Sequence, residues 1–273
     1  MKKIFSLVLS LMVILLVSCN PDDENNQDPK PVMPPEYSMA PNFDDFQAEG
    51  NQRNKTIENW FYSAVNVGVY SAVLKGSLAI PITAFKVTVS QEPFYDTEAG
   101  VWTWESSFSV HSNDYSIRLT ADVVDGNVDW KGYITSTSTH SISSYYPPEN
   151  FLWFEGQSNV NGNSGSWTLI DSPGNPSPWI KTEWSRNEAQ TEGIATFTIE
   201  KEGELQGSYI AYGRNENSGF NRSVEISNTQ SNDFIEIEWN SELKFGRVKS
   251  ENHFGDTDFH CWDQDLQDVS CEE

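Results

Sequence analysis

The carboxyl-terminal tail holds the densest set of side chains that could do chemistry. Its acids alternate with other residues, and such a run in a bent loop can offer oxygens to calcium, which takes about six to eight of them. The candidates are Asp256, Asp258, Asp263 and Asp265. The glycine and the terminal glutamate of an EF-hand loop are missing at the required positions, so the four are weak candidates. A solvated acidic loop is the alternative.

Two thiols lie in the same tail, Cys261 and Cys271. An even pair in an oxidising compartment usually forms a disulfide, which here would fasten a chain end that otherwise frays. Zinc is the alternative, but two thiols ten positions apart, with no second closely spaced pair, are a poor ligand set. The sequence therefore predicts a disulfide between Cys261 and Cys271.

Motifs of known catalytic sites are absent from the sequence. It contains neither a Gly-x-Ser-x-Gly elbow nor an HExxH pair. Glycoside hydrolysis needs two carboxylates about 5–10 Å apart, and a chain with 40 acids brings some together by accident. Acids beside strand aromatics, such as Glu105 and Glu155, should face solvent by alternation. The sequence predicts a protein that is not an enzyme and needs no cofactor.

The amino terminus carries the clearest signal. Lys2 and Lys3 precede an apolar run from Ile4 to Val17, broken only by two serines. This run is too short for a membrane span, which needs about 20 apolar residues, and is typical of the hydrophobic region of a secretory signal. It ends in Leu16-Val17-Ser18-Cys19.

That ending resembles the lipobox of bacterial lipoproteins. The resemblance implies lipid on the Cys19 thiol, cleavage after Ser18 and acylation of the new amino terminus, so residues 1–18 are a predicted signal peptide. Several acyl chains anchor a protein stably. The acidic cluster at residues 22–24 resembles the surface-export signal of Bacteroidota lipoproteins. These features imply a lipid-anchored outer-membrane protein, with the cell surface favoured over the periplasmic face.

Charge excludes one class of partner. The chain has a net charge of −23, and removing residues 1–18 takes away two lysines and no acid, which leaves −25. Such a chain is not expected to bind nucleic acid or anionic lipid headgroups through a basic face. The predicted partners are the membrane, through the lipid, and a lipid, another apolar ligand or a glycan.

Composition divides the mature chain into two parts. Prolines interrupt residues 19–42, and Asp and Asn keep them polar, so this stretch is predicted to be a disordered tether. Residues 43–273 are predicted to form one β-rich globular domain. Apolar spacing predicts a helix over residues 54–76, capped by Asn54 or Thr56, and a short second helix over residues 82–90 after a break at Pro81.

From Trp102 onward, apolar and polar residues alternate in short runs separated by turn residues. Asp125-Gly126-Asn127 predicts a tight hairpin turn. Together the runs predict a single antiparallel meander of about ten strands forming a barrel or half-barrel, with one or two amino-terminal helices packed on it. The order of elements resembles the open-barrel lipoprotein carriers of the LolA-like fold. The domain also resembles surface lipoproteins of the Bacteroidota around Phe154-Glu155-Gly156, Ser164–Trp167 and Asp256–Cys271, which implies no particular activity.

The chain is rich in aromatic residues, with ten Trp, ten Tyr and fifteen Phe. Strand tryptophans are usually core residues, but inward rings of an incompletely filled barrel could line an apolar pocket. The leading hypothesis is a non-catalytic lipoprotein that binds a lipid or another apolar small ligand between helix and sheet. The lining candidates, taken from predicted inward faces, are Trp60, Phe61, Trp104 and Trp130. The alternatives are a surface carbohydrate-binding protein with exposed Trp and Tyr, and a structural envelope protein without a ligand.

Overall fold

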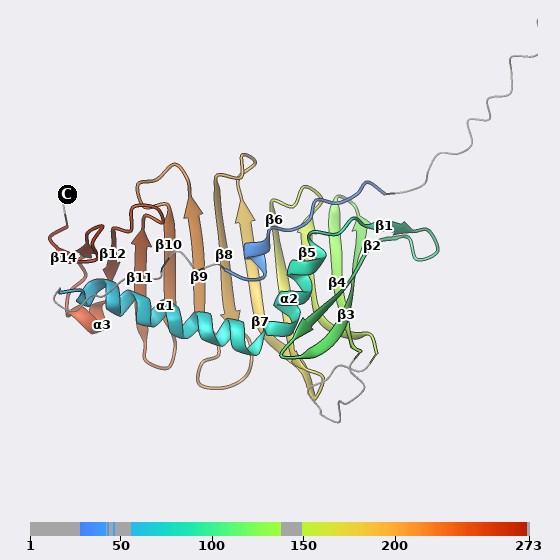
Figure 1. The fold of residues 1–273 in the computed structure, drawn as a ribbon, viewed down its shortest axis with the longest axis horizontal. Coiled ribbons are helices and arrows are strands. Elements are labelled where there is room, and N and C mark those ends of the chain that lie inside the picture. Colours follow the sequence, from blue (N-terminus) through green and yellow to red (C-terminus); the bar gives the residue numbers. More distant parts are fainter. Residues whose placement is uncertain (1–27, 42, 44–45, 47–55, 138–148, 272–273) are drawn as a thin grey trace, which may run out of the picture.

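The computed structural model describes residues 28–41, 43, 46, 56–137 and 149–271. These residues form one antiparallel sheet of fourteen strands, in which every strand pairs with its neighbours in the sequence (Figure 1). The strands are β1 (Phe94–Asp96), β2 (Val101–Val110), β3 (Asn113–Val124), β4 (Asn127–Ser136), β5 (Phe151–Asn159), β6 (Ser164–Ser172), β7 (Asn175–Arg186), β8 (Glu192–Ile199), β9 (Tyr209–Asn215), β10 (Arg222–Asn228), β11 (Asp233–Trp239), β12 (Gly246–Lys249), β13 (His260–Trp262) and β14 (Asp268–Val269).

The predicted antiparallel meander is confirmed, but the sheet does not close. β1 and β14 are its two free edges. The predicted turn between β3 and β4 is present: Asp125 and Gly126 both have positive φ, as a two-residue hairpin turn of type I′ requires. The sequence underestimated the number of strands because β1, β13 and β14 are only two or three residues long and carry almost no alternation.

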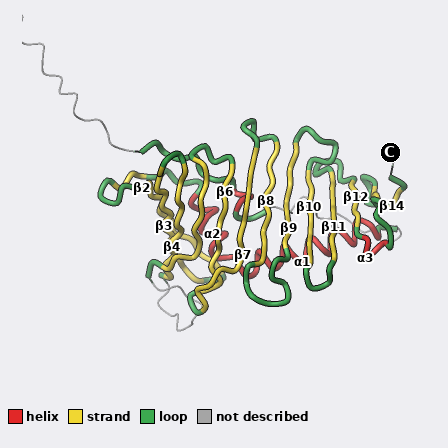
Figure 2. The backbone as a smooth tube through the Cα atoms, turned by 180° about the vertical axis from the view of Figure 1, so that it is seen from behind, coloured by secondary structure: helices red, strands yellow, loops and turns green. Residues whose placement is uncertain are grey.

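The two predicted helices are present and lie on one face of the sheet. α1 (Glu58–Ser77) contacts β12 and β13, whereas α2 (Ala79–Thr88) contacts β2. Figure 2 shows that the opposite face carries no helix. Among the described helices, none combines the length and apolarity needed to cross a bilayer. The break was predicted at Pro81 but falls at Leu78. Pro81 lies in the first turn of α2, where its missing N–H costs no helical hydrogen bond.

The start of α1 is capped from the far end of the chain. The Asp268 carboxylate accepts hydrogen bonds from the backbone N–H groups of Glu58 and Asn59, at 3.1 and 3.0 Å. The prediction of a Thr56 side-chain cap was wrong, because Ile57 occupies the cap position and no side chain there accepts a bond. Asn54 lies outside the described residues. A carboxylate at this position also interacts favourably with the helix dipole.

The disulfide predicted between Cys261 and Cys271 is present. It joins β13 to the residues just after β14, and β14 supplies the Asp268 cap of α1. The carbonyl of Cys261 also accepts a hydrogen bond from the Asn59 side chain at 2.9 Å. The bridge therefore stabilises the junction between the helix and the last strands.

Replacing Cys261 and Cys271 together by serine is expected to lower the free energy of unfolding by about 3 kcal/mol, the chain-entropy value for a loop of this length. Because β14 then detaches more easily, amide hydrogens in the first turn of α1 should exchange faster. Urea unfolding and hydrogen exchange measure the two effects. An unchanged unfolding free energy would contradict the stabilising role.

The core lies between the sheet and the elements on its covered face. Trp130, Trp167, Trp239 and Trp262 are among the largest fully buried side chains. Phe85 of α2 makes edge contacts with Phe154 and Trp167, at 6.3 and 5.4 Å between ring centroids. Edge-to-face packing of this kind contributes beyond the apolar area that it buries. Here most strand tryptophans fill the interior.

Several of these rings lie over a glycine on the neighbouring strand. Gly156 pairs with Trp167, Gly165 with Trp184 and Gly246 with Trp262. A Cβ atom on Gly156 would be 2.1 Å from the Ser166 carbonyl oxygen and 2.5 Å from the Trp167 ring. The missing side chains therefore make room for the indoles against the backbone.

Gly156→Ala is expected to destabilise the protein by about 3 kcal/mol, because both the backbone and the buried indole must move. Gly68→Ala is the matched control. Nothing lies within 4 Å of a Cβ at Gly68 in α1, so the exchange should stabilise the helix by up to about 1 kcal/mol. Chemical denaturation of both variants gives the comparison, and equal effects would rule out the close-approach explanation.

Part of the predicted disordered tether is ordered. The segment from Asp28 to Ala40 runs along the covered face and includes the short helix η1 (Glu36–Ser38). Val32 donates a backbone hydrogen bond to Val160 at 3.0 Å, and the Ser38 hydroxyl accepts one from the Trp167 indole at 3.0 Å. Met39 is fully buried. The prediction of disorder to residue 42 was wrong here, because apolar side chains between the prolines pack on the sheet. Residues 19–27 lie outside the described part.

Candidate functional site

The four aromatic residues predicted to line one apolar pocket lie in two separate parts of the fold. Trp104 and Trp130 are 2% and 1% exposed, and their ring centroids are 5.6 Å apart, so they pack on each other near the β2 end of the sheet. Trp60 stacks on Phe46, whose other aromatic contacts are Trp239 and Trp262 at the far end. These residues therefore do not share a cavity.

The inward placement predicted for Phe61 was wrong. Its side chain is 57% exposed and forms an outward ridge of α1 with Val65 and Val69. Almost the whole circumference of this helix is apolar, so periodicity could not identify its buried face. Among the side chains of α1 that the structure describes, the buried ones are Ser63, Val67 and Leu74.

The tail acids hold turns together. The Asp263 carboxylate accepts the backbone N–H groups of Asp265 and Gln267, and Asp256 accepts that of Asp258 and contacts the His260 ring at 3.1 Å. That contact to His260, more than the Asp258 N–H, lowers the pKa of Asp256. Within the described ranges, no three His, Cys, Asp or Glu side chains gather as metal ligands. The acids predicted as calcium candidates do not form such a group.

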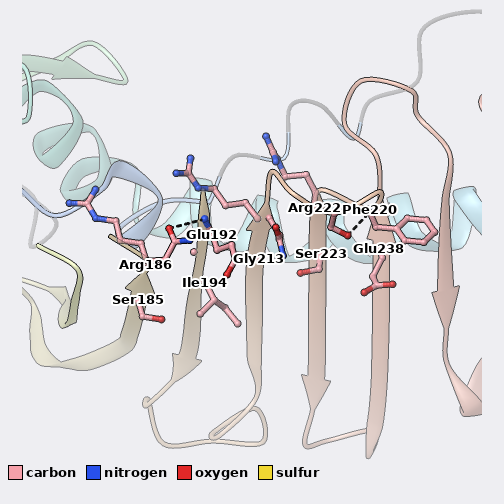
Figure 3. Close-up of a pocket in the computed structure, with 14 residues that line it drawn as sticks. Ser185, Arg186, Glu192, Ile194, Gly213, Phe220, Arg222, Ser223 and Glu238 are labelled. Atoms are coloured by element: carbon pink, nitrogen blue, oxygen red, sulfur yellow. Dashed lines mark hydrogen bonds between the residues drawn. The ribbon is translucent and has the colours of Figure 1, made fainter. Parts of the chain in front are cut away.

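A different site lies at one edge of the sheet. In an antiparallel meander every second turn falls at the same edge, and we call the edge with the turns after β3, β5, β7, β9 and β11 the upper rim (upper edge in Figure 1). At this rim, strands β7 to β11 form a pocket of about 450 Å³. Figure 3 shows Arg186 and Arg222 extending from the ends of their strands toward the rim.

Strand register brings three arginines of this pocket into one row. Arg186 pairs with Gly193, Gly193 with Arg214, and Arg214 with Arg222, so the row crosses four neighbouring strands. Arg214 and Arg222 are directly opposite each other on neighbouring strands, and two like charges in this position destabilise the sheet. Three of the five arginines in the described part of the chain therefore gather here, in a strongly acidic protein.

Two of these arginines lack an acidic partner. Arg222 forms an ion pair with Glu216 at 2.8 Å, but among the described residues no carboxylate lies within ion-pair distance of Arg186 or Arg214. Both arginines donate a hydrogen bond to Gln190. Arg186 donates to the side-chain oxygen of Gln190 at 3.5 Å, and Arg214 donates to its backbone carbonyl. The Nε–H groups of both are buried and make no hydrogen bond.

Tyr37 of η1 fixes the position of Arg214. The guanidinium carbon of Arg214 lies 5.3 Å from the centre of the Tyr37 ring, and the Tyr37 hydroxyl donates to the Ser185 carbonyl at 3.3 Å. Gly193 makes room for this ring, since a Cβ there would be 2.3 Å from the hydroxyl oxygen. Tyr37 therefore packs beside Arg214, outside the residues that line the pocket.

The electrostatics of the site favour an added negative charge. Partial burial is the main cause that lowers the pKa of Arg186; Tyr37 acts in the opposite direction, and the positive charge of Arg214 has a smaller lowering effect. Burial also raises the pKa of Tyr37, so its hydroxyl stays protonated and supplies no negative charge. An anion held between the two guanidinium groups would relieve their repulsion and satisfy their free donors.

The acids in and beside the pocket compensate this charge only in part. Glu216 is paired with Arg222, and Glu238 is paired with Arg247. Glu192 is exposed and makes no ion pair with a described residue. Arg247 is itself held between two rings, 4.6 Å from the centre of Phe220 and 4.0 Å from that of Phe259. The chemistry that the pocket offers is recognition of a phosphate, sulfate or carboxylate group, which suits the planar fork of arginine.

The sequence gives no local signal for this site, because Arg186, Arg214 and Arg222 lie far apart along the chain and meet only through strand pairing. No protein-family model, curated protein or solved structure matches the chain. The arrangement of the described side chains is therefore the basis for assigning a function.

Proposed function

We propose that the chain is a lipid-anchored, non-catalytic binding protein of the bacterial outer membrane, which holds an anionic group of its ligand at Arg186 and Arg214. The observation that carries this proposal is the pair of partly buried guanidinium groups without a described acidic partner. Burying an unpaired charge is costly, and an anion paired with these two groups would offset part of that cost.

The anchor part of the proposal is supported by sequence. Residues 1–18 have the layout of a secretory signal, and Cys19 follows Leu16, Val17 and Ser18 as in the lipobox of lipoproteins. The acidic residues after it favour the cell surface. The Cys261–Cys271 disulfide is of the kind that oxidising compartments maintain.

The nature of the pocket favours an anionic ligand over an apolar one. Its lining includes the three arginines and Asn187, and also Ser185 and Ser223, whose side chains point to the other face of the sheet from those of their neighbours Arg186 and Arg222. The aromatic residues proposed for an apolar site are instead divided between two parts of the fold. A glycan bearing phosphate, sulfate or carboxylate groups would supply such an anion.

Thermal unfolding tests the binding part. Sodium phosphate, sodium sulfate and glucuronate should each raise the melting temperature, whereas glucose, and sodium chloride at matched ionic strength, should not. An anion concentration of about a hundred times the dissociation constant would add about 2.7 kcal/mol to the free energy of unfolding. If none of the anions stabilised the protein more than chloride, the proposed site would be wrong. Palmitate labelling of the parent and of Cys19→Ser tests the anchor separately, and labelling of both or of neither would refute it.

A further inference from the structure

The described chain begins at the same rim as the arginine site. The carbonyl of Asp28 accepts a hydrogen bond from the Trp102 indole at 3.0 Å, near the start of β2. Val32 then bonds to Val160 in the turn after β5, and Tyr37 reaches Arg214. The segment that leads back to Cys19 therefore leaves the domain at the upper rim.

The remaining tether is short. Nine residues, 19–27, separate the bonded Asp28 from the start of the mature chain, and they span at most about 30 Å when extended. Arg186 on β7 lies five strands from Trp102 on β2, or about 24 Å across the sheet. A bilayer that holds the lipid of Cys19 is thus within reach of the arginine row.

Acids occur at both rims. The turns at the upper rim contain Asp125, Glu188, Glu216 and Glu242 beside the arginine row, and the β8–β9 loop at the opposite rim contains Glu200, Glu202 and Glu204 together with Lys201. The orientation toward a membrane therefore rests on the start of the described chain at the upper rim and on the arginine row, not on a difference in acidity between the rims.

From these observations we infer that the anionic group held by Arg186 and Arg214 is the phosphate of a lipid headgroup in the membrane that carries the anchor. This inference rests on the proposed function and names its ligand. Two guanidinium forks can each give paired hydrogen bonds to phosphate oxygens. The tether keeps the site at a high effective concentration of headgroups, so a weak individual contact suffices.

The inference is tested with the full lipidated chain in vesicles. Hydrogen exchange is compared between vesicles of phosphatidylcholine alone and vesicles that also contain phosphatidic acid. Amides in the turns after β7 and β9 should exchange about tenfold more slowly with phosphatidic acid, as expected for one added charge-assisted contact. The β8–β9 loop should not change, and Arg186→Gln with Arg214→Gln should abolish the protection.

The outcomes separate the inference from the function on which it rests. If both vesicle types gave equal exchange while inorganic phosphate still protected these turns in detergent, the site would bind a free anion and the lipid source would be wrong. If neither probe protected them, both proposals would fail. Protection in the double variant would show that the membrane contacts the domain elsewhere, which also overturns the inference.

Discussion

Replacing Trp167 by alanine is expected to destabilise the fold by about 4 kcal/mol, which is within the range for removing a fully buried tryptophan. Its side chain is 1% exposed and contacts rings from α2 and from two strands, namely Phe85, Phe154 and Trp130. Its indole N–H also donates to the Ser38 hydroxyl, which lies in the amino-terminal segment. One residue thus joins three parts of the structure.

Urea unfolding followed by circular dichroism measures this effect. Phe61→Ala is the control, because the same kind of truncation on the exposed ridge of α1 should change the unfolding free energy by less than about 0.5 kcal/mol. Trp167→Ala should also increase hydrogen exchange in η1, since Ser38 loses its partner. Similar destabilisation by both variants would mean that Phe61 is buried in solution.

Replacing Arg186 and Arg214 by glutamine is expected to weaken phosphate binding about a hundredfold or more. Each hydrogen bond to a charged partner contributes about 1.5–3 kcal/mol, so each arginine accounts for at least a tenfold change. Without an anion, the double variant should be at least as stable as the parent, because the repulsion between the two guanidinium groups is gone. Isothermal titration calorimetry and thermal unfolding measure the two quantities.

Matched variants distinguish a specific site from general charge. Lys181→Gln with Lys201→Gln removes the same charge from two exposed ion pairs outside the arginine row, with Glu183 and Asp171, and should leave phosphate binding within about twofold. Arg214→Lys keeps the charge but loses the fork, so it should bind with intermediate affinity. If the double lysine variant weakened phosphate binding as much as the double arginine variant, the effect would come from net charge and not from a specific site.

Much of the fold could be predicted because its signals are local. Trp104 and Phe108 alternate with polar residues within one strand, which predicts the strand. The two residues Asp125 and Gly126 are enough to predict the hairpin turn that they form. The disulfide followed from a count of thiols. The meander needed no further information, because each strand pairs with the next.

The arginine site could not be predicted, because its residues meet only through strand register. Arg186 and Arg214 come together across Gly193, and a shift of one residue in either pairing would place them on opposite faces of the sheet. The Asp268 cap of α1 depends in the same way on tertiary structure. Prolines correctly indicated a lack of regular structure before residue 42, but not that Met39 would be buried.

The two edges of the open sheet have a consequence for crowding. An unpaired strand edge can recruit a strand from another molecule, and copies held by the proposed lipid anchor would meet in a plane at high density. β14 offers only two residues, and the disulfide fastens the chain beside it. β1 covers only Val101–Thr103 of β2, so the seven residues from Trp104 to Val110 have no described strand on that side. The unpaired edge of β2, and not the β14 end, is therefore where neighbouring copies can pair.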